Sequence, residues 1–258
     1  MLNILKYDFY KLTHSKKLKI FYIVAIAVLF VVDSISYIST GSNTYSVLSF
    51  MRFSYTTICC CSLVFFVPLF IGEDFSSGYI KNIYTNTSKI CYVFSKLIYI
   101  IAFCVAMWLA EFIVFSLYVF IFGGKCFVSE SDYKYYVYYK YKEECCAAFL
   151  TEIFSMFGIK LLGFIAVGTI MMFFTVLFKN DIIVACVGFA YSFFLSGVIT
   201  NFLNDKTGVR FEYFLPFGTT QITMMIIWQN MLGGSLTLIG FSVLFAVFTW
   251  LIIKDRRV

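Results

Sequence analysis

The sequence has 258 residues, of which 61% are hydrophobic and only 13% are charged. Soluble domains carry about 25% charged residues, so this composition excludes an ordinary soluble protein and indicates a chain that crosses a membrane several times. The formal net charge of +6 fits membrane orientation better than nucleic-acid binding, because the basic residues stand mostly beside apolar runs. With only two prolines there is no sign of an interdomain linker, and we expect one all-α transmembrane domain over residues 1–258.

Residues 1–17 have the pattern of an amphipathic helix. Their apolar residues recur at helical spacing and share one face: Leu2, Leu5, Phe9 and Leu12. Lysines surround this face: Lys6, Lys11, Lys16, Lys17 and Lys19. We expect an interfacial helix whose basic flank meets anionic headgroups. A signal peptide with residues 20–32 as its apolar core is the weaker alternative, because the basic region is long and no small-residue cleavage site follows.

Six membrane spans are predicted from the apolar runs, near residues 18–38, 53–72, 92–122, 153–178, 182–202 and 236–253. The first span must contain Asp33, since the uninterrupted run before it is too short to cross the membrane. Pro68 would kink or end the second span. The third span is longer than a perpendicular crossing needs, so we expect it to tilt or protrude.

Two longer connections separate the later spans. Residues 123–150 interleave tyrosines with lysines, a pattern typical of anchoring at the membrane interface, and a peptide-contacting surface is the alternative. A disulfide from Cys126 to Cys145 or Cys146 could close this loop. Residues 204–234 are expected to hold a short re-entrant or interfacial helix between spans five and six.

The distribution of Lys and Arg predicts the orientation. The N-terminus, residues 73–96, residues 179–181 and the C-terminus fall on one side, and this side carries the excess of basic residues. That side is expected to be cytoplasmic. Residues 123–150 and 204–234 are then external.

Three charged residues are predicted to lie within the outer half of the membrane: Asp33, Glu111 and Lys160. A lipid-exposed charge there costs about 3 kcal/mol or more, so each should face protein or water. One interpretation is structural, with Asp33 or Glu111 paired to Lys160. The other is a polar pathway that opens outward, and the two are compatible.

Motifs of the common enzyme classes are absent from the sequence. Its one histidine, His14, argues against a catalytic triad or a histidine metal site. The nine cysteines do not form a metal-binding pattern, and no phosphate-binding loop or hydrolase signature occurs. We therefore expect a protein that is not an enzyme and holds no cofactor or metal of its own.

The longest polar interruption of the first half begins at residue 72 and lies between spans two and three. Phe75, Tyr79 and Ile83 recur at every fourth position, which predicts a helix. Asp74 suits its N-cap, where an acid is favoured by the helix dipole. We expect a short amphipathic helix outside the bilayer, over residues 74–90.

This segment, residues 72–82, contains an acid, Phe75, two small residues, Gly78 and then Ile80-Lys81-Asn82. Together with Ser88-Lys89, Ser95-Lys96 and the six-span topology, it resembles the type-2 ATP-binding-cassette exporter permeases. The resemblance is greatest to the bacterial subfamily linked to bacitracin and lantibiotic self-protection. The variable position before Ile80 is commonly threonine in that family and is Tyr79 here, which puts only fine contact geometry in doubt.

The resemblance implies an export function. The loop after span two would be a coupling helix that docks on a separate ATPase, with contact residues drawn from this set: Glu73, Asp74, Phe75, Gly78, Tyr79, Ile80, Lys81 and Asn82. Two ATPases, which bind ATP and Mg, would assemble with this permease and a second one, identical or paralogous, in the bacterial cell membrane. An amphipathic compound such as an antimicrobial peptide would be the substrate, and no nucleic acid is involved. A six-span sensor or scaffold without transport is the alternative, and an intramembrane enzyme is less favoured because no nucleophile–base pair is visible.

Overall fold

The structure is a computed structural model that describes residues 2–40, 47–80, 88–122, 146–191, 196–207 and 228–255. These described residues form helices and contain no strand, which confirms the all-α prediction. The helices are α1 (Leu2–His14), α2 (Lys16–Thr40), α3 (Val47–Ser76), α5 (Lys89–Phe122), α7 (Cys146–Phe178), α8 (Asp181–Ala190), α9 (Ser196–Thr207) and α11 (Trp228–Asp255).

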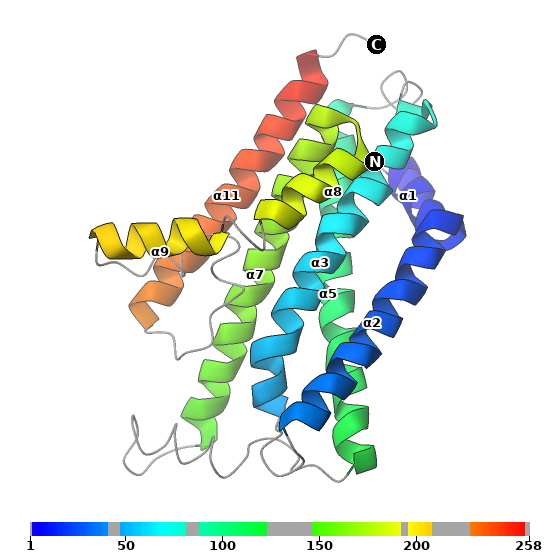
Figure 1. Cartoon of the computed structure of the whole chain (residues 1–258). Helices are drawn as coiled ribbons and strands as arrows, with labels where there is room; N and C mark the ends of the chain where they lie inside the picture. Colours follow the sequence, from blue (N-terminus) through cyan, green and yellow to red (C-terminus); the bar gives the residue numbers. More distant parts are fainter. Residues whose placement is uncertain are drawn as a thin grey trace.

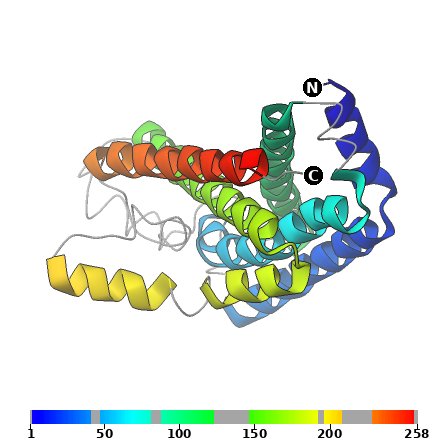
Figure 2. The same ribbon diagram turned by 90° about the horizontal axis from the view of Figure 1, so that it is seen from above.

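Five long helices, α2, α3, α5, α7 and α11, run along one another in a bundle (Figure 1). α3 is the central element, since it packs against α2, α5, α7 and α8, while α11 packs mainly on α7. Seen from above, α1 lies at the edge of the bundle away from α9 (Figure 2). The start of α1 and the end of α11 lie toward one end of the bundle, and the end of α3, the start of α5 and the connection from α7 to α8 lie there too (Figure 1).

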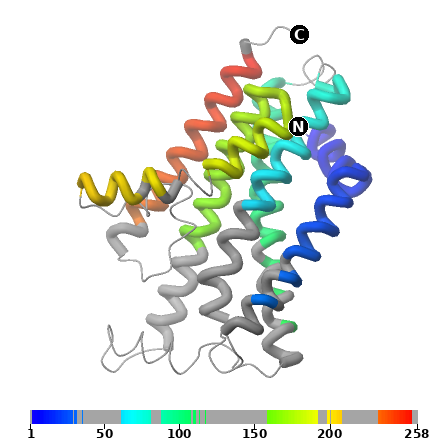
Figure 3. Tube along the Cα trace, viewed as in Figure 1, coloured from blue at the N-terminus to red at the C-terminus, as the bar shows by residue number. Residues whose placement is uncertain are grey.

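Figure 3 colours the part of the chain whose side chains are described, and within this part a hydrophobic core lies between α3, α5 and α7. Phe66 of α3 stacks on Phe103 of α5, with ring centroids 3.8 Å apart. Gly168 of α7 allows that helix to approach α5 closely, since a Cβ at this position would lie 2.5 Å from Ile100. Side chains of this kind exclude water and fix the mutual positions of the three helices.

Three described segments are long and apolar enough to cross a membrane: Lys89–Met107 in α5, Gly158–Phe178 in α7 and Leu232–Lys254 in α11. They coincide with the third, fourth and sixth predicted spans. Their surfaces fit a lipid environment, because exposed positions along α11 are apolar, among them Leu236 and Val243. Membrane association is thus supported, and the count of six spans stays a prediction.

The predicted fifth span, residues 182–202, corresponds to two described helices. α8 ends at Ala190 after ten residues, a length of about 15 Å, and α9 begins at Ser196 and projects away from the bundle (Figures 1 and 2). The apolar residues continue past α8 into α9, so the sequence does not show where α8 ends. A fifth span over residues 182–202 stays a prediction, because residues 192–195 lie outside the described part.

Several predictions fall outside the described residues. They include the tyrosine-rich loop up to residue 145, with Cys126 and Cys145, and most of the external helix expected near residues 214–228. Cys146 begins α7, and Asp33 and Glu111 lie on α2 and α5, but the side chains of these three residues are also outside the description. The disulfide and the pairing of Lys160 with an acid accordingly remain predictions.

Candidate functional site

Glu73, Asp74 and Phe75 form the last turn of α3, which extends to Ser76. The prediction that Asp74 caps the start of a separate helix is therefore wrong. Gly78 ends the helical path instead, because its φ of +70° is a left-handed conformation that glycine adopts at little cost. The chain becomes helical again at Tyr79 and Ile80, and the predicted contact residues Lys81 and Asn82 lie outside the described part.

Asp74 is completely buried and accepts from three side chains. Its Oδ1 lies 2.7 Å from the Lys11 Nζ of α1, and its Oδ2 lies 2.7 Å from the Lys96 Nζ of α5. The Tyr92 hydroxyl, also on α5, donates to Oδ2 at 3.0 Å. One carboxylate of α3 thus joins α1 and α5.

A second buried carboxylate, Asp8 of α1, completes the network. The Lys96 ammonium lies 2.5 Å from its Oδ1, and the Ser95 hydroxyl donates to its Oδ2 at 2.6 Å. Lys96 therefore bridges Asp8 and Asp74, and it also lies over the ring of Phe70, 4.5 Å from the centroid. We call Asp8, Lys11, Asp74, Tyr92, Ser95 and Lys96 the buried charge network.

Glu73 lies at the edge of this network and is partly exposed. Its Oε2 is 3.8 Å from the Lys11 ammonium, and the Ser15 hydroxyl donates to its Oε1 at 3.2 Å. Lys11 also donates to the backbone carbonyl of Phe70. Lys11 is thus held by groups from the last two turns of α3.

The network is electrostatically self-contained, because two aspartates and two lysines compensate one another in a region without solvent. Burial alone would raise the pKa of Asp74, but the Lys96 and Lys11 ammonium groups outweigh it and hold that pKa below its ordinary value. Burial lowers the pKa of Lys11 despite the attraction of Asp74. Asp74 is consequently ionised at neutral pH, and removing one charge would leave its partners unpaired.

The orientation of α1 follows from these contacts. Asp8 and Lys11 face the bundle, while Leu2 and Phe9 are more than half exposed. The prediction that Lys11 belongs to the basic flank is wrong, whereas Lys6, Lys16, Lys17 and Lys19 are exposed as expected. The Tyr99 hydroxyl adds a further tie, since it donates to the Leu5 carbonyl at 2.7 Å.

The first residues after Gly78 are also held against the bundle. The Tyr79 ring stacks on the ring of Tyr7 of α1, with centroids 3.8 Å apart, and Ile80 is buried within the core. Burial raises the pKa of Tyr7 and of Tyr79 above the usual range for tyrosine. We call residues 73–80 the loop root, since they lead from α3 into the connection to α5.

The remaining predicted residues do not join this site. Lys160 is buried in α7, a helix that is distant in sequence from the loop root. His14 is exposed, and its ring stacks on the ring of Tyr10. Within the described residues no group of His, Cys, Asp and Glu side chains could hold a metal ion. The described cysteines Cys61, Cys91, Cys104 and Cys186 do not form disulfides.

Asp8 and the bridging role of Lys96 were missed by the sequence reasoning. The available signal was the i, i+3 pair Asp8 and Lys11, two opposite charges that lie near one face of a helix. A second signal was Lys96, a cation inside the apolar run of α5. Neither pattern by itself identifies Asp74 as the common partner.

The comparisons with known proteins add no family. The sequence matches no family model, and no curated protein is significantly similar to it.

Proposed function

We propose that this chain is the permease subunit of an ATP-driven exporter whose connection between α3 and α5 docks on a separate ATPase. The observation that carries the proposal is the anchoring of the loop root. Asp74, Tyr79 and Ile80 attach it to α1, α5 and the core. A segment that transmits force must be fixed to the helices that it moves. The loop root meets this condition, because it is attached to α1 as well as to α5 and the core.

The mechanism follows from these attachments. A movement of the docked loop is passed to the end of α3 through Gly78, and through Lys96 to the start of α5. Asp8 and Lys11 extend the movement to α1, so three helices shift as one unit. Rigid-body rocking of this kind is a common way in which transporters expose a pathway alternately to the two sides.

The energy source and the substrate are inferred from the sequence. The chain has no phosphate-binding loop, so ATP and Mg would be held by a partner chain, in two copies, with a second permease completing the assembly. The resemblance favours an amphipathic substrate such as an antimicrobial peptide, exported for resistance in a bacterial cell membrane. Both termini and the loop root would face the cytoplasm.

Co-purification tests the docking. The full chain is produced in its source cell together with its own neighbouring genes, and the tagged permease is isolated in mild detergent and analysed for a bound ATPase. We expect the ATPase to be retained, and Lys81→Glu to release it without changing the melting temperature of the permease. Lys6→Glu is the matched control, because Lys6 is an exposed lysine of α1, outside the connection between α3 and α5.

Failure of the ATPase to co-purify with the unaltered chain would contradict the proposal. So would equal retention by the Lys81→Glu and Lys6→Glu variants. Resistance that survives inactivation of the ATPase would favour a sensor or scaffold instead.

A further inference from the structure

Two apolar grooves lie side by side on the outer surface of α3. The first, about 470 Å³, lies between α2 and α3 and is lined by Val24, Val28 and Cys61, with Lys17 at one end. The second, about 550 Å³, lies between α3 and α8 and is lined by Ile182 and other residues of α8. Each volume is in the range of small-molecule sites.

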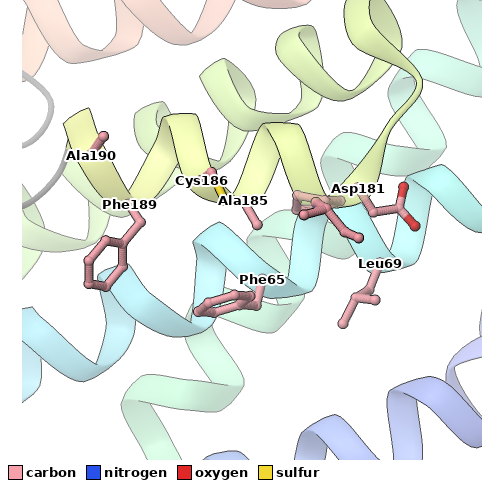
Figure 4. A pocket seen from close by; sticks show the side chains of 9 residues that line it. Phe65, Leu69, Asp181, Ala185, Cys186, Phe189 and Ala190 are labelled. Carbon is pink, nitrogen blue, oxygen red and sulfur yellow. The ribbon is translucent and has the colours of Figure 1, made fainter.

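A single ridge separates the grooves, because Phe65 and Leu69 of α3 line both of them. Figure 4 shows the second groove, with Asp181 at one end, Phe189 at the other and Phe65 between them. An occupant with two parallel apolar chains could place one chain on each side of this ridge. A glycerophospholipid has this shape.

The length of the grooves matches one leaflet of a membrane. From Lys17 to Val28 the first groove follows α2 over about 16 Å, and α8 covers about 15 Å beside the second, at ~1.5 Å per residue. Half of a hydrocarbon core of ~30 Å is about 15 Å. The helices α2 and α8, which line the grooves, both begin toward the end of the bundle where α1 starts (Figure 1).

The charge at that end is complementary to an acidic headgroup. Lys17 lies at the rim of the first groove, and Lys16 and Lys19 beside it are exposed. Asp181, the acid near Lys17, is half-buried and packs over Gly72 of α3. The cations therefore dominate the solvent-facing part of the rim.

We propose that the paired grooves bind one anionic glycerophospholipid of the leaflet nearest the chain termini. Its acyl chains lie on either side of the Phe65–Leu69 ridge, and its phosphate faces Lys17. Such a lipid would fill the space between α2, α3 and α8 and would hold α2 and α8 against α3. This proposal requires only that the protein lies in a membrane. It does not depend on the proposed role as a permease.

Native mass spectrometry of the full chain tests the site. The protein is purified in detergent, exchanged into equal amounts of phosphatidylglycerol and phosphatidylcholine with identical acyl chains, and analysed for retained lipid. A lysine near an acidic headgroup changes binding about fivefold, so we expect at least that preference for phosphatidylglycerol. Lys17→Gln should abolish the preference, whereas Lys6→Gln, a change of an exposed lysine outside the groove, should keep it.

A second experiment fills the groove between α2 and α3 with a larger side chain. Val24→Trp should remove the retained lipid, and Val28→Trp repeats the test further along the groove. Val243→Trp is the control, because Val243 lies on α11 with an exposure of 58%, close to the 53% of Val24. Melting temperatures of all variants show whether each one is folded.

Three results would overturn the proposal. The unaltered chain could retain both lipids equally, or the folded Val24→Trp and Val28→Trp variants could retain as much lipid as Val243→Trp. Alternatively, Val24→Trp could convert a dimer to a monomer and leave lipid retention unchanged, which would assign the groove to a second copy of the chain.

Discussion

The Lys96 ammonium of α5 lies 2.7 Å from the Asp74 carboxylate of α3, and both side chains are fully excluded from solvent. The pair stands where α3 ends and α5 begins, so it closes the base of the connection between these two helices. Lys96 also binds Asp8, which adds α1 to the same junction. The contacts therefore tie the loop root to α1 and α5 at this junction.

Replacing Asp74 by alanine should be strongly destabilising, because Lys11 and Lys96 lose their shared carboxylate. Removing one partner of a buried ion pair costs about 3–5 kcal/mol. We expect a marked fall in the melting temperature in detergent, measured by tryptophan fluorescence. Asp205→Ala in α9, where the aspartate is exposed, is the control and should have little effect.

Removing the Asp8–Lys96 pair together should cost less than the sum of the two single changes. In Asp8→Asn the buried Lys96 ammonium loses one partner. In Lys96→Met the carboxylates of Asp8 and Asp74 both lose a partner. The double variant leaves fewer charges unpaired and therefore avoids part of both penalties. Contacting residues of one network show coupling energies of about 0.5–3 kcal/mol. A double-mutant cycle by denaturant unfolding measures this term, and strict additivity would show that the two residues do not interact.

The stabilising effect of Asp74 should be lost in the acid range. Because the folded-state pKa of Asp74 is lowered, its contribution is fully present above the unfolded pKa of about 3.9. It is lost as the pH falls through the lower, folded-state value. The difference in unfolding free energy between the unaltered chain and Asp74→Asn should therefore be constant near neutral pH and shrink below about pH 4. A difference that already shrinks between about pH 7 and 5 would contradict the ionised state assigned to Asp74.

Loss of the Tyr7–Tyr79 stack should loosen the loop root with a small effect on the bundle. Aromatic pairs contribute about 0.5–1.5 kcal/mol beyond their buried area. Tyr79→Ala should therefore increase amide hydrogen exchange at residues 79–80, while Tyr79→Phe keeps the slow exchange. Tyr10→Ala, which removes an exposed stack on His14, should leave exchange at the loop root unchanged.

Gly78→Ala should destabilise through backbone conformation alone. The φ of Gly78 is +70°, and an added Cβ would meet no atom within 4 Å, so no steric clash contributes. A left-handed conformation costs a non-glycine residue about 1–2 kcal/mol. Gly78→Asn should cost less, since asparagine adopts this conformation more readily, and thermal unfolding of the two variants gives the order. Equal stability of Gly78→Ala and the unaltered chain would contradict the left-handed assignment.

The sequence by itself determined the helical membrane class. Composition and the long apolar runs are sufficient for this, because a spanning backbone must satisfy its own hydrogen bonds and the helix does so within one segment. The helices of residues 2–14 and 89–122 also followed from local periodicity and apolar length. The end of α8 at Ala190 was not evident, since apolar residues continue past it in the sequence.

Only the tertiary structure decided the role of the charged residues. Asp74 has a local pattern that suits a helix start, yet it lies in the last turn of α3, where lysines from α1 and α5 compensate its charge. Lys11 has the local pattern of a headgroup-binding lysine, yet it is buried for the same reason. Each of these charges is stable in a region without solvent only when partners from distant segments converge on it, and that convergence is a property of the packed fold.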